Sequence, residues 1–420
     1  MSTMHLSITP HDPIIARDGR PFGIGQGIRM RSLDWPYPSV LAGSLRTMLG
    51  KMNGGFSNDN AITGLLEISI AGPMPVKGTQ LFYPIPKDII AKEKKGIRSA
   101  IPLRPITLRK DEYCDFPISG IIPAMIPDYL EDDFKPEKLP AFWSLEKMIK
   151  WLANSDGTDF VLCKNAINED DETNRCEDKK KRKFWSNDPD FLDSPEIDER
   201  VQTGIERNTG VADVENGLLF MSSGLDLSAT EKGGRISLAA RVRTDNIYKD
   251  LVDKLDEIHP FGGERRLAHW FRADEPAGWK CPPEIPSKLT ELNSGKIRMV
   301  LATPAIFSNG WLPGWLDPKS LEGIPPGAKD DQKLKLISAC TDRWRPISGW
   351  SAESRGPKAI RRMVPAGSVY FFEAKIAETA SDLAKSHWLE PVCDKPQDCK
   401  DGFGLAVWGV WDKNENEDEN

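Results

Sequence analysis

Short strand-type runs recur along this chain, and only a few segments with helical periodicity separate them. Apolar or alternating runs stand at 216–227, 234–244, 296–307, 361–374 and 402–411, and strand character is also present near the start, at 65–76 and at 81–86. Apolar residues recur at helical spacing in 39–52, 144–154 and 245–258. Many strands with a few interposed helices predict an α+β fold rather than a helical bundle.

The split order of these strands and helices favours units of the ferredoxin type. The second half shows the pattern clearly, and an interrupted version of it in the first half predicts a second unit. We therefore expect an N-terminal domain at 1–210, with a variable insertion at about 87–198, and a C-terminal domain at 211–420. A length of 420 residues suits two domains of this size.

Charge is unevenly distributed along the chain. The net charge of −7 argues against a free-standing nucleic-acid-binding domain. Segment 343–372, however, holds six cationic side chains and one anionic one, whereas 412–420 is an acidic tail. A basic strip on an otherwise acidic protein can hold RNA locally while other faces meet protein partners. The charged insertion at 168–185 is expected to be an exposed loop, with RNA contact through its lysines as the alternative.

Five segments combine cationic side chains with glycines, which allow close backbone approach to a ligand. Arginine, amide and hydroxyl donors suit RNA phosphates and 2′-hydroxyl groups. For 12–27 a bare turn is an equally good interpretation, and for Arg46 an exposed helical arginine is the more common outcome. The candidate RNA-binding residues are Arg17, Arg20, Arg46, Arg200, Gln202, Thr203, Gly204, Arg265, Arg266, Arg355, Lys358, Arg361, Arg362, Gly402 and Gly404.

Signatures of other chemistry are weak. The chain has no GxxxxGK[ST], HExxH or GxSxG motif, and Cys393 and Cys399 lack the spacing of a zinc site, so we predict no cofactor, no metal and no catalytic residue. Metal-independent RNA cleavage by a histidine is the alternative, with His11 beside Asp12 as the first candidate and His259 as the second. Tryptophans 311, 315, 344 and 350 suit either core packing or partner docking.

Location follows from the same composition. No run of eighteen apolar residues and no signal-type N-terminus is present, so neither a membrane span nor secretion is expected. Seven scattered cysteines fit a reducing cytoplasm.

Several long blocks resemble one known family. DPIIARDGRPF, WPYPSVLAGSLRT, ERVQTGI, FGGERRLA, ATPAIFSNGWLPGW, RGPKAIRRMVPAGSVYFFE and GFGLAVWG are similar, in register from residue 12 to about 411, to the third Cmr subunit among the RAMP proteins of CRISPR systems. The region 87–195 contributes little to this resemblance. It implies two RRM-like ferredoxin folds and a non-catalytic subunit of the type III-B effector. It also implies capping of the crRNA 5′ tag and docking of the large Palm-type polymerase/cyclase subunit and a backbone RAMP subunit.

Overall fold

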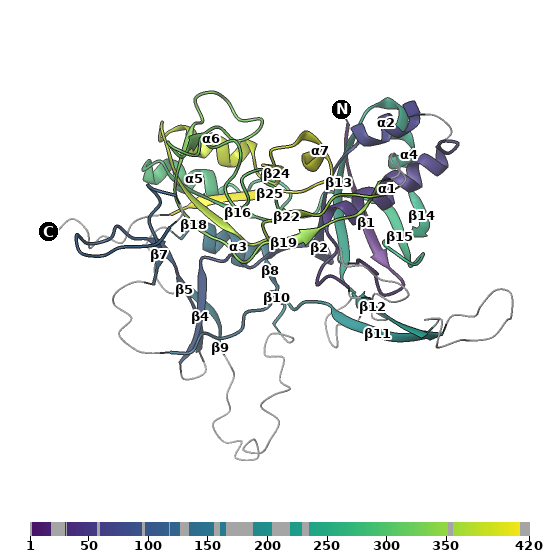
Figure 1. Ribbon diagram of the computed structural model, residues 1–420, viewed down its shortest axis with the longest axis horizontal. Coiled ribbons are helices and arrows are strands. Elements are labelled where there is room, and N and C mark those ends of the chain that lie inside the picture. Colours follow the sequence, from purple (N-terminus) through teal and green to yellow (C-terminus); the bar gives the residue numbers. More distant parts are fainter. Residues whose placement is uncertain are drawn as a thin grey trace, which may run out of the picture.

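The computed structural model shows a mixed α and β protein with two large antiparallel sheets (Figure 1). It describes residues 2–17, 30, 32–56, 59–94, 97–116, 118–126, 134–154, 160–164, 188–203, 219–228, 235–351 and 356–411. The helices of this described part are α1 (Pro38–Met52), α2 (Asp59–Glu67), α3 (Leu145–Leu152), α4 (Asn246–Asp253), α5 (Glu284–Leu292), α6 (Thr379–Ser386) and α7 (Pro396–Lys400). None of them is long and apolar enough to cross a membrane.

The N-terminal sheet has eight strands and is covered on one face by helices. Met4, Leu6 and Ile8 of the first strand point to the buried face, where α1 and α4 pack on the sheet. On the opposite face of the same strand Ser7 and Thr9 are half-buried and His5 is buried. In spatial order the strands are β10 (Phe191–Leu192), β8 (Phe142–Ser144), β3 (Gln80–Pro84), β2 (Ser69–Lys77), β13 (Ser237–Thr244), β1 (Ser2–Pro10), β15 (Leu267–Ala273) and β14 (Asp256–Pro260).

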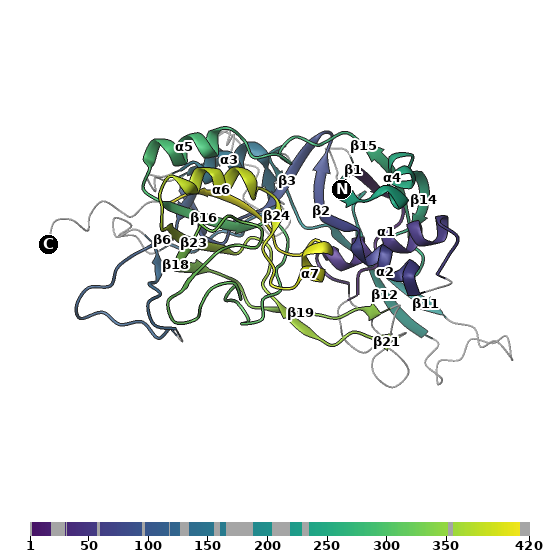
Figure 2. The ribbon, with the colours of Figure 1, turned by 90° about the horizontal axis from the view of Figure 1, so that it is seen from above.

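The C-terminal sheet has six strands, and α5 and α6 lie side by side on it (Figure 2). All six residues of its strand β25 are buried, because α3, α5 and α6 contact this strand. A continuous apolar strand of this kind is typical of a sheet interior. In spatial order the strands are β17 (Glu322–Gly323), β18 (Leu334–Cys340), β23 (Val369–Ala374), β16 (Lys296–Leu301), β25 (Leu405–Val410) and β24 (Glu390–Pro391).

Smaller ribbons extend from these two sheets. The insertion forms a three-stranded sheet and a short pair, and further pairs form an arm and a hairpin that carry candidate RNA-binding residues. The strands are β4 (Ile89–Lys94), β5 (Ile97–Pro102) and β9 (Phe160–Lys164); β6 (Arg104–Pro105) and β7 (Ala124–Met125); β11 (Glu196–Thr203) and β12 (Leu219–Asp226); β19 (Arg345–Ile347) and β22 (Arg361–Met363); and β20 (Trp350–Ser351) and β21 (Gly356–Pro357).

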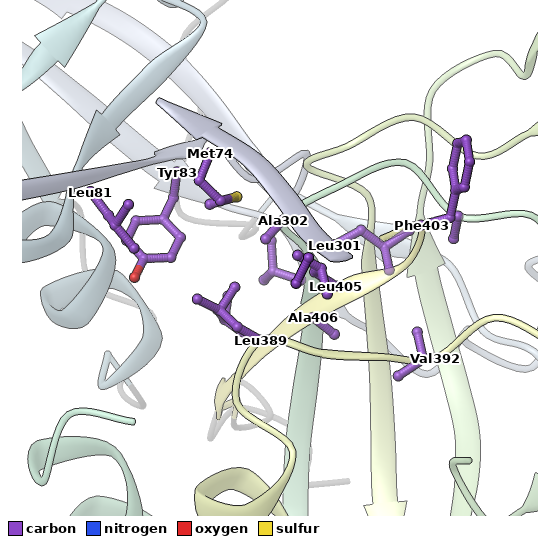
Figure 3. Close-up of a cluster of buried hydrophobic side chains, with 14 of the residues drawn as sticks. Met74, Leu81, Tyr83, Leu301, Ala302, Leu389, Val392, Phe403, Leu405 and Ala406 are labelled. Carbon is purple, nitrogen blue, oxygen red and sulfur yellow. The ribbon is translucent and has the colours of Figure 1, made fainter. Parts of the chain in front are cut away.

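An apolar cluster joins the two halves of the molecule. Figure 3 shows Met74, Leu81 and Tyr83 of the N-terminal sheet facing Leu389 and Leu405 of the C-terminal half, and all five are fully buried. The Tyr83 hydroxyl donates a hydrogen bond to the carbonyl of Gly278, at 2.6 Å, in the linker between the sheets. Burial of large apolar side chains on both sides stabilises the joint without fixing its register.

A buried charge cluster adds directional interactions, namely ion pairs and hydrogen bonds, to this joint. The Asp88 carboxylate lies 2.6 Å from the Arg298 guanidinium of β16 and 3.7 Å from the Arg104 guanidinium of the insertion. All three side chains are fully buried. The indole of Trp151 donates to the same carboxylate at 3.1 Å, and Arg298 also donates to the Trp151 carbonyl. Burial lowers the pKa of Arg298, while the charge of Asp88 counteracts this effect.

The structure corrects several expectations about the elements. Helix α1 begins at Pro38, one residue before the expected start at 39, and Tyr37 is at the N-cap position. The expected helix at 245–258 ends at Asp253, and an edge strand begins at Asp256. Helix α2 was not predicted. The expected helix at 144–154 is confirmed, since the Ser144 hydroxyl caps α3 by accepting a hydrogen bond from the Lys147 amide.

The change of sheet does not coincide with the expected division at 210/211. Strands β13, β14 and β15 belong to the N-terminal sheet, which therefore continues to Ala273. The long insertion between β2 and β13 hid this pairing, because the sequence gives no sign of which distant strands are neighbours.

Replacing Asp88 with Asn tests the charge cluster. The change leaves two buried guanidinium groups without a carboxylate, so the free energy of unfolding should fall by about 3–5 kcal/mol. Chemical denaturation monitored by fluorescence measures it. The control Glu146→Gln breaks an exposed ion pair with Lys150 and should cost less than about 1 kcal/mol. Equal effects of both substitutions would contradict the role given to Asp88.

Candidate nucleic-acid interface

The segment that follows β1 connects two of the basic regions. Ile14 exchanges backbone hydrogen bonds with Leu225 of β12 at 2.9 and 2.7 Å, and the Ile15 carbonyl accepts a hydrogen bond from the Gly263 amide at 2.7 Å. Ile14, Ile15 and Ala16 are buried, whereas Arg17 is exposed. This segment therefore brings Arg17, the β11–β12 arm and the turn at 261–266 into one neighbourhood.

The turn at 261–266 has an unusual backbone. Gly262, Glu264 and Arg265 have φ angles of 80°, 54° and 51°, which lie in the left-handed region. At Gly262 a Cβ atom would lie 2.5 Å from the Ile15 carbonyl oxygen, so a side chain cannot be accommodated. Left-handed non-glycine residues cost energy and persist where surrounding contacts enforce them, often at functional sites. The turn fixes the backbone of Arg265, and the Arg265 side chain is exposed.

A second connection runs from Arg17 to the basic hairpin. Arg17 forms a backbone bridge with Ser32, and the Ser32 amide donates to the Ser223 hydroxyl of β12 at 2.8 Å. Two residues later, the Asp34 carboxylate accepts a hydrogen bond from Arg345 of β19 at 2.6 Å. The hairpin β19–β22 therefore adjoins the same neighbourhood. The sequence did not indicate the roles of Asp34 and Ser32, because their partners are remote in the chain.

Exposed cations of this hairpin complete the candidate interface. Lys358 and Arg362 are exposed, while Arg361 donates to the Asp398 carboxylate at 2.8 Å. The Asp398 side chain is only 4% exposed, so this ion pair clamps the hairpin onto α7. Arg361 therefore has a structural partner, and Lys358 and Arg362 are the better candidates for contact with an external anion.

Arg46 has a different place from the one expected. Its guanidinium is buried in the structure and donates to the Asp401 carboxylate, to the Ile68 carbonyl at 2.9 Å and to the Lys400 carbonyl at 3.2 Å. The expectation that a charged head emerges from α1 is corrected, because these acceptors join α1 to the segment after α7. The sequence around Arg46 contains no signal that predicts an acceptor 355 residues away.

The glycines before β25 approach the protein's own backbone. A Cβ atom at Gly402 would lie 2.6 Å from the Ile70 carbonyl oxygen, and one at Gly404 would lie 2.7 Å from the Cys393 sulfur. Both residues have positive φ angles, of 93° and 73°, and both are buried. The lack of a side chain at Gly402 permits close packing against β2 of the other sheet, and that at Gly404 permits close packing against Cys393, where an RNA strand was expected.

Other candidates are paired, partly buried or outside the described part. Arg200 is exposed on β11 and pairs with Asp198 at 2.6 Å. Gln202 and Thr203 end the same strand, with side chains outside the described part. The structure gives Arg266 an intermediate exposure, with its Nε atom buried. Further predictions lie outside the described residues: Arg20, Gly204, Arg355, the charged insertion at 168–185 and the acidic tail at 412–420.

The histidines fall into two groups. His5 and His387 are buried, and burial lowers the pKa of His5 to about 4. His11 and His269 stack at 6.5 Å between ring centroids, and the His269 Nε2 atom lies 2.5 Å from the Asp256 carboxylate. Asp12, the expected partner of His11, instead accepts a hydrogen bond from the Leu267 amide at 2.8 Å. Burial lowers the pKa of His259.

Among the residues that the structure describes, no group of three or more His, Cys, Asp or Glu side chains is placed to hold a metal ion. Trp311 and Trp315 pack against the core, Trp344 is 52% exposed, and the Trp350 side chain lies outside the described part.

Arg46 and Arg265 should behave differently when each is replaced with Ala. Arg46→Ala leaves the Asp401 carboxylate buried without its partner and should lower the free energy of unfolding by about 3–5 kcal/mol. Arg265→Ala removes an exposed side chain and should change that free energy by about 0.5 kcal/mol or less. Thermal or chemical denaturation of both variants measures the difference. A stable Arg46→Ala variant would return this residue to the set of RNA candidates.

Comparisons with known proteins identify the family. Residues 6–411 match the family model described as CRISPR-associated protein (Cas_Cmr3). No curated protein matches the sequence significantly.

Similar solved structures include a chain of the type III-B Cmr-beta bound to cognate target RNA, with 14% identity and a TM-score of 0.44 over 87% of this chain and 86% of that chain. A second, with cognate target RNA and AMPPnP in state 1, has 15% identity and a TM-score of 0.42 over the same shares of 87% and 86%. A chain of the Csm3-Csm4 subcomplex of the type III-A CRISPR-Cas interference complex has 12% identity and a TM-score of 0.34 over 89% of this chain and 97% of that chain. Because the family model spans nearly the whole sequence, the protein belongs to the Cas_Cmr3 family of CRISPR-associated proteins.

Proposed function

We propose that this protein is a non-catalytic subunit of a type III-B CRISPR-Cas (Cmr) effector complex, in which it holds the 5′ tag of the crRNA. The observation that carries the proposal is that remote segments adjoin one another: the backbone joins the segment of Arg17 to the turn of Arg265, and the Asp34–Arg345 pair joins it to the hairpin of Lys358 and Arg362. Membership of the Cas_Cmr3 family supports the CRISPR setting. Its biological role is then antiviral defence in the cytoplasm.

The strand order supports an interpretation as two ferredoxin-like domains. Each sheet contains four adjacent antiparallel strands. In spatial order these are β2, β13, β1 and β15 in the N-terminal sheet, and β18, β23, β16 and β25 in the C-terminal sheet. Taken in chain order, each set is arranged 2-3-1-4, which is the order of a split β-α-β unit. In the second set α6 follows the third strand, and α5, which precedes the first strand, packs beside α6.

Pre-organisation is the mechanism that this geometry supports. The strained turn holds Arg265, and ion pairs to Asp34 and Asp398 hold the hairpin that carries Lys358 and Arg362. Segments whose backbone is fixed before binding lose less conformational entropy when their cations meet phosphates. Phosphate contacts position an RNA without reading its sequence, which suits a subunit that grips a guide.

We extend the proposal to the protein partners. The large Palm-type polymerase/cyclase subunit and a backbone RAMP subunit are the partners that the family resemblance implies. A net charge of −7 combined with a local basic face leaves acidic surface for protein contacts.

A second candidate function is metal-independent RNA cleavage. The specific observation that favours it is the His11–His269 stack with Asp256 against His269, close to the turn that carries Arg265. Two imidazoles and a cation are groups that general acid–base cleavage uses.

Crosslinking tests the proposed grip. A 5′-labelled guide RNA irradiated with the full-length chain should give an intact crosslinked product that maps to the 5′ tag. In parallel titrations, Arg265→Ala should weaken guide binding and reduce the slope of log affinity against log salt by about 0.7. The control Lys335→Ala removes an exposed cation of β18 and should change neither quantity. Equal behaviour of the two variants would count against the interface.

Histidine replacement separates the two functions. If the protein only grips RNA, labelled guide stays full-length on a denaturing gel with the wild-type chain and with His11→Ala and His269→Ala alike. Shortened RNA that disappears in either variant would establish cleavage and overturn the non-catalytic assignment.

A further inference from the structure

The hairpin β19–β22 has two faces of different character. Its register pairs Arg345 with Met363 and Pro346 with Arg362. Side chains alternate between the faces of a strand, so Ile347 and Met363 share one face, and both are buried. Pro346 and Arg362 share the other face, and both are exposed.

The exposed face carries a tryptophan. Trp344 directly precedes β19, and the Arg362 guanidinium lies over its ring, 4.7 Å from the ring centroid. The Trp344 side chain is nevertheless 52% exposed, and Ile360, two residues before Arg362, is 65% exposed. By contrast, Trp143, Trp151, Trp270, Trp408 and Trp411 are all fully buried. A large aromatic ring left half in water on a face that carries cations marks a contact surface.

We infer that Trp344, with Arg362 over its ring, is a stacking platform for one unpaired base of a single-stranded RNA. The inference rests on the proposed function, and it adds a contact to a base where that function needs only phosphates. Indole rings and guanidinium planes are the groups on which proteins stack unpaired RNA bases. The Arg362 cation also limits the rotation of the ring, so the platform is formed before RNA arrives.

The surrounding charges favour RNA over a protein as the occupant. Among the described residues, no carboxylate lies within ion-pair distance of Arg343, Lys358 or Arg362, while the neighbouring Asp342 pairs with Lys87 at 3.4 Å. Exposed cations without anionic partners, set around an aromatic ring, fit a backbone of phosphates that carries bases. Since every base has a π-face, the platform fixes the position of the strand without selecting its sequence.

Binding of a fluorescein-labelled uridine octamer to the full-length chain tests the platform. Trp344→Ala should weaken binding roughly 5- to 150-fold, the range expected for loss of a stacking aromatic. The slope of log affinity against log salt should stay unchanged, because no charge is lost. Trp344→Phe should restore most of the affinity, and Lys358→Ala should instead reduce the slope by about 0.7. A blunt RNA duplex, whose bases are already stacked, should be insensitive to Trp344→Ala.

Tyr113→Ala is the matched control, since Tyr113 is an aromatic residue that is 90% exposed in the remote insertion. If Trp344→Ala binds the octamer as Tyr113→Ala does while Lys358→Ala binds weakly, the platform is wrong and the proposed function survives. If neither Lys358→Ala nor Arg265→Ala weakens binding, the proposed function itself fails. Normal octamer binding with lost subunit assembly in Trp344→Ala would reassign this face to a protein partner and overturn the inference.

Discussion

The Asp88 carboxylate is the group on which the joint between the two halves depends. It follows β3 of the N-terminal sheet closely in sequence, yet it pairs with Arg298 in the middle of the C-terminal sheet and with Arg104 of the insertion. Two cations around one buried carboxylate leave an excess positive charge, which the Trp151 carbonyl and ring offset in part. Removal of the carboxylate would expose the full desolvation cost of both guanidinium groups. This arrangement tolerates little displacement of one sheet against the other.

Apolar contact alone would not fix that geometry. The cluster of Met74, Tyr83, Leu389 and Leu405 supplies burial, which is non-directional. Hydrogen-bonded ion pairs are directional, and a second one, Arg46 with Asp401, links α1 to the segment before β25. The turn at 261–266 and the hairpin β19–β22 lie on elements joined in this way. The backbone segments that carry their cations are therefore held at set positions relative to one another, which favours recognition of a phosphate chain.

Local signals in the sequence predicted local structure well. Apolar residues at helical spacing in 144–154 predicted the helix α3, and the run at 402–411 predicted the strand β25. The prediction for Arg46 failed because its partner, Asp401, is remote, and a charged residue on a helix normally points to water. Gly402 was predicted to face a ligand. The sequence cannot separate this role from the one observed, because a glycine is needed both for close approach to a ligand and for close approach of two backbones in the same chain. The blocks similar to a known family identified the family because they extend over most of the chain.

The number of cations in a basic strip overstates how many of them can bind an anion. Within 343–372, Arg345 and Arg361 are paired with Asp34 and Asp398 and act mainly to hold the hairpin. The Asp34 pair is open to solvent, with side chains 50% and 59% exposed, so phosphate can compete for Arg345 at little cost. The Asp398 carboxylate is 4% exposed, so loss of Arg361 would leave a buried charge. Exchange of Arg361 for an RNA contact is therefore unfavourable, and the affinity of this face must come from Lys358, Arg362 and the exposed cations of the neighbouring turns.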